Sequence, residues 1–343
     1  MALAFIVAGV GLASLALTWW LSRPDAPIRI LDHPNERSLH AAPIPRTGGL
    51  AICGALVAGW TASSVLFQSQ ILPGQVLLGT VLIAAIAVLD DRFGLPQSIR
   101  LFVQFIAALV LIYGGFVLQG DWLPGVSSPD EPVVVLAGTV LLTLWLTNLY
   151  NFMDGMDGFA AGMAVIGFGA LALLGWGQGD ALFAGAALTI SAAAAGFLWF
   201  NFPPARIFMG DSGSTTLGFL VAAFAIWAGR REVAPVWLVL VVFSPFVVDA
   251  TVTLLKRAAR GEPVWKAHRR HYYQRLVQLG WGHRRTVLAE YAAMLVCATA
   301  ALSVSAAGPG VQWTMITVLA AVYGYAAYAI HTLEKKSNAK ICS

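Results

Sequence analysis

Long apolar stretches separated by short polar segments make up almost the whole chain. A stretch of roughly 17–23 apolar residues is long enough to cross the hydrocarbon core of a bilayer as a helix. About eleven such stretches occur, so the pattern predicts an all-α protein with about eleven transmembrane helices. The stretches fall near residues 2–21, 48–68, 72–89, 99–119, 133–148, 159–176, 181–200, 213–229, 234–255, 286–306 and 311–331.

Composition agrees with a polytopic membrane protein. Of the 343 residues, 58% are hydrophobic and 11% are charged, whereas soluble domains carry roughly 25% charged residues. No Gly-rich nucleotide fingerprint and no low-complexity linker interrupts the sequence. We therefore predict one transmembrane domain over residues 1–343, with no nucleic-acid partner.

The basic residues orient the predicted helices. All but two of the 21 Lys and Arg residues fall in alternate loops or in the C-terminal tail, the exceptions being Arg230 and Arg231. Basic loops face the cytoplasm, which predicts a periplasmic N-terminus and a cytoplasmic C-terminus. The first stretch has no basic residue before it and is followed by Arg23, so we interpret it as a retained helix and not as a cleaved signal.

Cysteines suggest no structural chemistry. Cys53 and Cys297 fall in predicted spans and Cys342 falls in the tail, without paired spacing. Neither a disulfide framework nor a thiolate metal site is indicated.

The most unusual polar segment runs from residue 148 to residue 158, where an apolar stretch ends. It contains two amides and two carboxylates at three-residue spacing: Asn148, Asn151, Asp154 and Asp157. If the helix continues, these side chains lie near one face. Polar groups at such depth are costly unless they have a function, and oxygen ligands suit Mg²⁺ or the polar part of a substrate. The alternative is a helix end followed by an Asp-Gly turn and the cap of the next helix.

Two further carboxylate motifs lie on the same predicted side. Asp90 and Asp91 end the third stretch, where neighbouring negative charges oppose the helix dipole, so a cation or a proton-transfer role would explain them. Asp211 precedes the eighth stretch and suits a metal that bridges phosphates. The simpler interpretations are a solvated helix end with Arg92 as partner, and a helix cap at Asp211 or Ser212.

The longest predicted cytoplasmic loop, 256–285, carries a basic cluster of His268, Arg269, Arg270 and His271. Guanidinium groups match phosphate oxygens, so an anion site fits this cluster better than a metal site. Attraction to anionic lipid is the alternative. Asp249 lies inside the ninth stretch, and a functional role and pairing with Arg257 or Arg260 are equally open.

The order of these motifs resembles the polyprenyl-phosphate N-acetylhexosamine-1-phosphate transferases of glycosyltransferase family 4. The resemblance covers roughly residues 32–285. Its parts are the PIPR-x-GG loop that contains Arg46, the Asp-Asp pair at 90–91, the NLYNFMDGMDG segment at 148–158, GDSGS at 210–214 and HRRHYYQRL at 268–276. Five motifs in the family's order make the resemblance specific.

The resemblance implies a reaction, a cofactor and a location. Such enzymes move a sugar-1-phosphate from a UDP-N-acetylhexosamine to undecaprenyl or another polyprenyl phosphate and release UMP. They do so with Mg²⁺, or with Mn²⁺ as an alternative, at the cytoplasmic face of the bacterial inner membrane. Predicted active-site loops are 22–47, 90–98, 148–158, 201–212 and 256–285, and a homodimer is left open.

The resemblance also assigns roles to residues. Asp211 would ligate the metal, with Asn151 as a second ligand, while Asp90 and Asp91 would handle metal or lipid phosphate. Asn151, Asp154 and Asp157 would shape the nucleotide site, and the basic cluster 268–271 would hold phosphate or sugar. Arg46 and Asn148 complete the predicted substrate-binding set.

One departure bears on the substrate. The chain has His-Arg-Arg-His at 268–271 where the peptidoglycan-precursor branch has three His in a row. This favours the branch that initiates O-antigen and lipopolysaccharide synthesis over a phospho-N-acetylmuramoyl-pentapeptide transferase, which is the main alternative. A secondary transporter would place its polar groups near the midplane and show repeated halves. A non-catalytic lipid-binding scaffold does not explain the carboxylate pairs, and the motif of CDP-alcohol phosphotransferases is absent from 154–162. The sequence does not identify the sugar.

Overall fold

The computed structural model describes the chain except residues 1, 29, 33–42, 67–70, 264–267 and 342–343, so parts of two predicted active-site loops lie outside the described residues. Helices dominate the described part. In chain order they are α1 (Ala2–Leu21), α2 (Gly48–Leu66), α3 (Gly74–Phe93), α4 (Gln97–Tyr113), α5 (Pro132–Met153), α6 (Phe159–Gly177), α7 (Ala181–Asn201), α8 (Asp211–Arg230), α9 (Val236–Val242), α10 (Ser244–Ala259), α11 (Tyr272–Leu276), α12 (Gly282–Val304) and α13 (Pro309–Ile341), with a π-helical turn, η1 (Val277–Trp281), before α12. Two short antiparallel hairpins complete the fold: β1 (Leu31–Asp32) with β2 (Ile44–Pro45), and β3 (Asp121–Leu123) with β4 (Val126–Ser127).

Each predicted apolar stretch corresponds to a helix or to a bent pair of helices. Eight described helices are long and apolar enough to cross a membrane, and counting α9 with α10 as one bent span gives nine. α4 is a shorter apolar helix of 17 residues. The all-α polytopic class is confirmed, while the number of crossings and the orientation of the termini stay predictions.

The predicted stretch 234–255 is bent. α9 ends at Val242, α10 begins at Ser244, and the two helices lie at 89° to each other. Pro245 occupies the first turn of α10, where its missing N–H is tolerated, but its ring cannot continue a helix from α9. Apolar residues flank the break on both sides, so hydropathy alone does not reveal it.

α8 passes through the centre of the bundle, and 94% of its most apolar window is buried. Glycines let its neighbours approach closely. A Cβ on Gly218 would lie 2.7 Å from the Leu146 carbonyl oxygen on α5, and a Cβ on Gly49 of α2 would lie 2.1 Å from the Gly213 nitrogen. Small residues at contacts are a common way to pack helices closely in a membrane.

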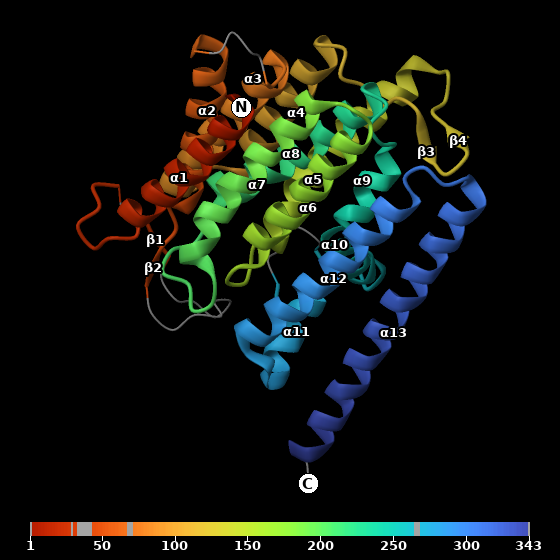
Figure 1. Ribbon diagram of the computed structural model, residues 1–343. Coiled ribbons are helices and arrows are strands. Elements are labelled where there is room, and N and C mark those ends of the chain that lie inside the picture. The colour runs from red at the N-terminus through yellow and green to blue at the C-terminus, as the bar shows by residue number, and fades with distance from the viewer. Residues whose placement is uncertain (1, 29, 33–42, 67–70, 264–267, 342–343) are drawn as a thin grey trace.

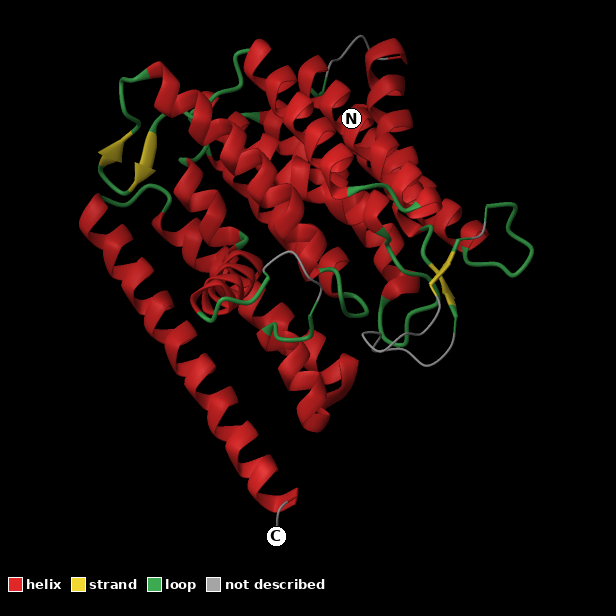
Figure 2. Cartoon of the chain, turned by 180° about the vertical axis from the view of Figure 1, so that it is seen from behind, coloured by secondary structure: helices red, strands yellow, loops and turns green. Residues whose placement is uncertain are grey.

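α13 differs from the other long helices because it stands at the edge of the molecule beside α12, as both views show (Figure 1, Figure 2). Only 6% of its most apolar window is buried. Its contacts include a hydrogen bond between the hydroxyls of Tyr323 and Ser244 at 2.8 Å. Near its C-terminal end Glu334 Oε1 accepts from Arg275 Nε at 2.6 Å.

The polar ends of several helices meet at one end of the bundle. The Gly48 and Gly49 N–H groups at the start of α2 donate to the carbonyl oxygens of Phe208 and Met209, at 2.9 and 2.7 Å. The Phe208 N–H in turn donates to the Pro45 carbonyl oxygen at 2.7 Å. These bonds join the β2 strand and the α2 start to the segment that leads into α8, and so they bring sequence-distant loops together.

Candidate active site

Two adjacent carboxylates end α3, and the first is held by the turn into α4. Gly94 stops the helix with φ of 63°, and its N–H donates to the Asp90 carbonyl oxygen at 2.8 Å. The Leu95 N–H then donates to Asp90 Oδ1, and Arg100 Nη1 donates to Asp90 Oδ2, both at 2.7 Å. A carboxylate at a helix C-terminus opposes the dipole, and the charge-assisted bond to Arg100 offsets that cost.

The second carboxylate caps another helix. Asp91 accepts hydrogen bonds from the Asp211 and Ser212 N–H groups, at 3.3 and 3.0 Å, and so satisfies the N-terminus of α8. Arg46 Nη2 donates to the Asp91 carbonyl oxygen at 2.7 Å. Gly210 lets the backbone before α8 lie this close to Arg46, because a Cβ at position 210 would lie 2.4 Å from the Arg46 carbonyl oxygen. Its φ of 72° is also one that glycine adopts without strain. Asp91 thus joins the ends of α3 and α8.

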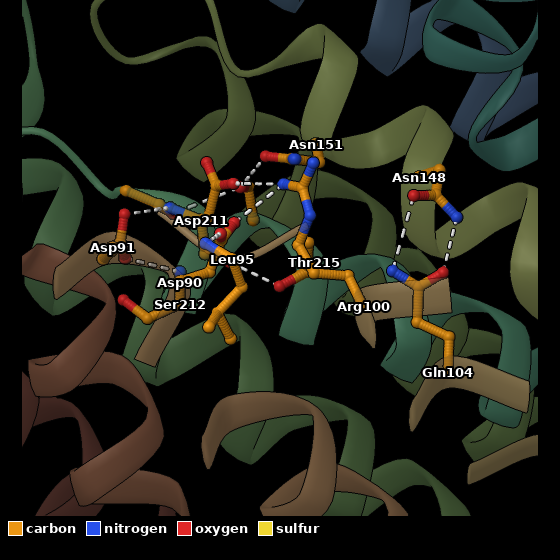
Figure 3. Close-up of polar contacts among 12 residues, drawn as sticks. Asp90, Asp91, Leu95, Arg100, Gln104, Asn148, Asn151, Asp211, Ser212 and Thr215 are labelled. Atoms are coloured by element: carbon orange, nitrogen blue, oxygen red, sulfur yellow. Dashed lines mark hydrogen bonds and ion pairs between the residues drawn. The ribbon is translucent and has the colours of Figure 1, made fainter. Parts of the chain in front are cut away.

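Arg100 connects the third carboxylate to the first. Its Nη1 lies 2.7 Å from Asp90 Oδ2 and 3.3 Å from Asp211 Oδ2, so one guanidinium bridges two acids from different helices (Figure 3). Asp90 and Asp91 are buried, whereas a third of the Asp211 side chain remains exposed. Three carboxylates are therefore gathered around two arginines, Arg46 and Arg100, with Asp211 as the most accessible acid.

The α5 amides lie beside this acidic cluster, defined as Asp90, Asp91 and Asp211. The Ser214 hydroxyl donates to Asn151 Oδ1 at 2.6 Å, which ties α5 to the first turn of α8. Asn148 Nδ2 donates to Gln104 Oε1 at 2.6 Å, and Gln104 Nε2 lies 3.4 Å from Asn148 Oδ1, an amide pair between α5 and α4 (Figure 3). Asn151 therefore lies beside the acidic cluster through its bond to Ser214, while Asn148 pairs with Gln104 and joins α5 to α4.

α5 ends at Met153, so the four polar residues at three-residue spacing do not share one helix. Asp154 is in the turn that follows. Within the part of the chain that the structure describes, its carboxylate has no hydrogen bond or ion pair. Burial is the largest cause of a raised pKa at Asp154, and together with the negative charges of Asp211, Asp91 and Asp157 it raises that pKa to about 8. A bound cation near Asp154 would therefore stabilise the ionised form of its carboxylate.

Asp157 has a different environment. Its Oδ2 accepts from the Ala205 N–H at 3.0 Å, and its Oδ1 lies 3.1 Å from His283 Nδ1 at the start of α12. Asn201 Oδ1 accepts from the adjacent Gly158 N–H at 2.9 Å. The observed contacts of Asp157 therefore hold the 154–158 turn against α12 and the segment after α7.

The donor set suits a hard divalent cation. Mg²⁺ prefers oxygen ligands and usually keeps several waters while it binds one or two carboxylates and substrate phosphates. Asp211, Asp90, Asp154 and the Asn151 carbonyl oxygen are donors of that kind at one end of the bundle. Among the described residues no three His, Cys, Asp or Glu side chains converge to hold a metal by themselves. The chemistry of the donors fits Mg²⁺ with substrate oxygens completing its shell.

The second part of the site begins at His271, which is held by Asp249. His271 Nδ1 lies 3.3 Å from Asp249 Oδ1, and the Tyr272 and Tyr273 N–H groups donate to the same carboxylate at 3.0 and 3.3 Å. His271 also forms a capping box with Gln274 at the start of α11. The intramembrane carboxylate of the ninth stretch therefore anchors the basic loop.

The His268 ring lies tilted against the His271 ring, with centroids 4.7 Å apart. Burial is the largest cause of a lowered pKa at His268, and together with the neighbouring His271, Arg257 and Arg270 it lowers that pKa to about 4, so the ring is neutral at neutral pH. Arg270 pairs with Glu262 and is half-exposed. Arg269 and Arg270 both line a cavity toward α13.

Tyr273 links the two parts of the site. A Cβ on Gly155 would lie 2.3 Å from the Tyr273 hydroxyl oxygen, and the rings of Tyr273 and Phe159 are 4.6 Å apart. α11 therefore packs directly on the 154–158 turn that carries Asp154. The predicted site residues thus form an acidic cluster and a neighbouring basic loop.

Sequence reasoning missed Arg100, Ser214 and His283. Arg100 was counted only as a cytoplasmic charge, although it is the one basic residue of α4 and follows the Asp-Asp pair after a Gly-Leu-Pro turn. Ser214 lies inside GDSGS, where Asp211 and Ser212 were considered as functional or capping residues and Ser214 was not. His283 offered no signal, because its partner Asp157 is far away in sequence.

An all-α bundle of apolar helices with a polar site at the helix ends defines the class of the protein as a polytopic integral membrane protein. A family model described as glycosyl transferase family 4 matches residues 74–229, the segment that holds the acidic cluster. The chain is 30% identical to a probable undecaprenyl-phosphate N-acetylglucosaminyl 1-phosphate transferase of Bacillus subtilis, over 82% of this chain and 78% of the relative.

Two other relatives agree. The chain is 33% identical to a decaprenyl-phosphate N-acetylglucosaminephosphotransferase of Mycobacterium tuberculosis, over 82% of this chain and 78% of the relative. It is 30% identical to a phospho-N-acetylmuramoyl-pentapeptide-transferase of Anoxybacillus flavithermus, over 74% and 81%. The chain belongs to glycosyl transferase family 4.

Proposed function

We propose that this protein transfers an N-acetylhexosamine-1-phosphate from a UDP-sugar to undecaprenyl or a related polyprenyl phosphate, with release of UMP. The observation that carries the proposal is the acidic cluster held by Arg46 and Arg100 at the helix ends. The relatives named for polyprenyl-phosphate transfer support the acceptor, and we infer a place in the bacterial inner membrane with the site facing the cytoplasm.

Asp211 is the residue that we propose to hold Mg²⁺, with the Asn151 carbonyl oxygen beside it. When bound, the metal neutralises the diphosphate oxygens that would otherwise repel an incoming phosphate. Arg100 already bridges Asp90 and Asp211, so its cation lies where negative charge gathers during transfer. The neutral His268 and the arginines at 269 and 270 then suit recognition of the polar donor.

We propose direct attack by the lipid phosphate and not a covalent enzyme intermediate. A phosphate monoester has a second pKa of about 6, so it is largely ionised near neutral pH and needs little activation. Asp90 is the candidate nucleophile of the rival scheme, yet each of its oxygens already accepts a hydrogen bond at 2.7 Å. Such bonds lower the nucleophilicity of a carboxylate and favour a positioning role for Asp90.

Isotope exchange separates the two schemes. Labelled UMP is incubated with UDP-sugar and protein stripped of polyprenyl phosphate. Direct attack predicts no exchange without the lipid. Robust exchange that disappears in Asp90→Asn would assign the nucleophile to Asp90.

A panel of donors tests the proposed reaction itself. Purified protein in detergent is given undecaprenyl phosphate and one donor at a time, namely the UDP derivatives of N-acetylglucosamine, N-acetylfucosamine, N-acetylquinovosamine or N-acetylmuramoyl-pentapeptide. We expect UMP and a lipid-linked diphosphate sugar with an N-acetylhexosamine donor, and loss of both products on chelation. Turnover with the pentapeptide donor alone would make the alternative branch the correct one, and O-antigen initiation would then be excluded.

Reporter fusions test the proposed orientation of the protein in the membrane. Reporter fusions after Gln278 and at the C-terminus should both give a cytoplasmic signal, because all but two of the 21 basic residues share the predicted side. A periplasmic signal at either point would separate the two parts of the proposed site.

A further inference from the structure

A basic cavity of about 660 Å³ lies between α10, α11 and α13, apart from the acidic cluster. Six cationic side chains line it: Lys256, Arg257, Arg260, Arg269, Arg270 and Arg275. None of Asp90, Asp91, Asp211, Asn151 or Asp154 is among its described lining. We propose that this cavity binds the phosphodiester headgroup of an acidic phospholipid, whose acyl chains lie along α13.

The charges of the cavity favour an anion. Glu334 is the acid among its described lining residues, and it pairs with Arg275. Glu262 pairs with Arg257 and Arg270 from the adjoining loop. Among the described residues, these two carboxylates are fewer than the cations that line the cavity, and like charges around one cavity repel one another unless an anion joins them. Guanidinium and ammonium groups bind phosphate oxygens through short, charge-assisted bonds.

Two of the six cations are well placed for an additional ligand. Lys256 donates to the Tyr272 hydroxyl, a neutral group. Arg260 is exposed, and its guanidinium has no hydrogen bond or ion pair with any residue that the structure describes. Both side chains extend from the last turns of α10, so a headgroup phosphate in the cavity would meet positive charge that no carboxylate among the described residues offsets.

The apolar surroundings indicate a lipid and not a soluble ion. α13 is the least buried of the long helices, and its Tyr325 and Tyr328 side chains are exposed, as is Leu255 on α10. Tyrosine is enriched at membrane interfaces, and basic side chains there attract acidic lipids. A phospholipid suits this arrangement, because its phosphate could contact the cationic side chains of the cavity while its acyl chains contact the exposed apolar surface beside it.

The ligand would bridge two elements that touch little otherwise. Tyr328 and His331 of α13 line the cavity together with Arg269 and Arg270 of the basic loop. A bound headgroup would hold α13 against this loop in the same way as the Arg275–Glu334 pair. The proposal does not rest on the identity of the sugar donor or the acceptor.

Binding can be measured by native mass spectrometry of the full-length protein titrated with phosphatidylglycerol or phosphatidylcholine. We expect the wild type to retain phosphatidylglycerol selectively and the Lys256→Ala/Arg260→Ala double variant to bind it at least about tenfold more weakly, since each basic residue near the surface contributes about 1 kcal/mol. Arg284→Ala is the matched control, because Arg284 is an exposed basic residue of α12 outside the cavity. Its phosphatidylglycerol binding should equal that of the wild type.

Folding and competing ligands are controlled in the same experiment. The charge-preserving double variant Lys256→Arg/Arg260→Lys should keep wild-type binding, and thermal unfolding shows whether each variant is folded. Equal binding of phosphatidylglycerol by the wild type and the folded alanine variant would overturn the proposal. So would full displacement by inorganic phosphate, which would assign a soluble anion, or one-for-one displacement by polyprenyl phosphate, which would assign the acceptor lipid.

Discussion

α8 and α13 are both long apolar helices that qualify as membrane spans, but the protein uses them in opposite ways. In α8, 94% of the most apolar window is buried, and in α13 only 6% is. The neighbours of one glycine in each helix show the difference. A Cβ on Gly218 would contact the backbone of α5 at 2.7 Å, whereas a Cβ on Gly324 would have no heavy atom within 4 Å.

This difference in burial shows that close helix packing fixes the position of a reactive side chain. α8 presents Asp211 from its first residue, and close packing on α2 and α5 fixes where that carboxylate lies. α13 carries its charged residues near its C-terminal end, where the Glu334 carboxylate accepts from Arg275. Hydropathy finds both helices, but only the packing of α8 provides the rigid support that a reacting group needs.

The largest expected effect belongs to α8. Asp211→Asn removes the charge that we propose to hold the metal, so transferase activity should fall about 10³-fold while the protein still folds. UMP release in detergent measures the activity, and thermal unfolding reports the fold. Asp130→Asn, an exposed carboxylate in a connecting loop, is the matched control. Near-normal turnover by folded Asp211→Asn protein would remove Asp211 from the mechanism.

Adding one methyl group to each helix tests the packing contrast directly. Gly218→Ala forces α8 away from α5 and should lower the free energy of unfolding by about 1–3 kcal/mol. Gly324→Ala should change it by less than about 1 kcal/mol, with alanine favoured for its helix propensity. Denaturation of the two variants in one detergent gives the comparison. Equal destabilisation would mean that α13 is packed as closely as α8.

The pH dependence of stability should differ between Asp154, beside the acidic cluster, and His268, in the basic loop. Burial raises the pKa of Asp154 from its usual 3.8 to about 8, so the folded state keeps a proton that the unfolded chain releases. Stability should therefore fall as the pH rises from about 4 to about 8. Asp154→Asn removes this dependence, and we expect it to exceed the wild type in stability at pH 8 by on the order of 1–3 kcal/mol, with the smallest difference near pH 4.

The basic loop should respond in the acidic range. Burial lowers the pKa of His268 from its usual 6.5 to about 4, so the unfolded chain takes up a proton that the folded state excludes. The His268 contribution to stability should be lost as the pH falls from about 6.5 to about 4. The free energy of unfolding of His268→Gln, measured at several pH values across that range, should depend less on pH than that of the wild type. Parallel curves would show that the ring is not buried in solution.

The smallest effect is expected at the exposed arginines. Arg269→Ala and Arg270→Ala should mainly raise the KM for the UDP-sugar, by about two- to fivefold, because partly exposed charges are screened by solvent. Steady-state kinetics at varied donor concentration measure the change, with Arg284→Ala as the control. Unchanged kinetics in both variants would remove Arg269 and Arg270 from donor binding.

The sequence predicted the helices well because a long apolar segment marks a membrane-crossing helix whether it is buried in the bundle, as α8 is, or stands at its edge, as α13 does. The bend at Phe243 was missed, since the residues on both sides are apolar and only Pro245 marked it. Residues 272–285 were predicted as part of a loop, but they form α11, η1 and the start of α12. Gly280, with φ of 89°, permits the kink between them.

Convergence of the site was predictable from topology, but its pairings were not. Asp90, Asp91 and Asp211 were all expected on the same predicted side of the membrane, and the structure brings them together. The partner of Asp249 was sought at Arg257 or Arg260, while the contacts found for its carboxylate include His271, which lies 22 residues away across the basic loop. Partners that depend on how two loops fold over each other carry no periodic signal in the chain.

The bond from Asp91 to the start of α8 has a practical consequence for mutational scanning. Asp91 holds two N–H groups of another helix, so replacing it would leave that helix end unsatisfied and reduce the amount of folded protein. A growth screen would score this loss as severely as the loss of a reacting group. Protein abundance must therefore be measured beside fitness at position 91, whereas Asp211 should lose fitness at normal abundance.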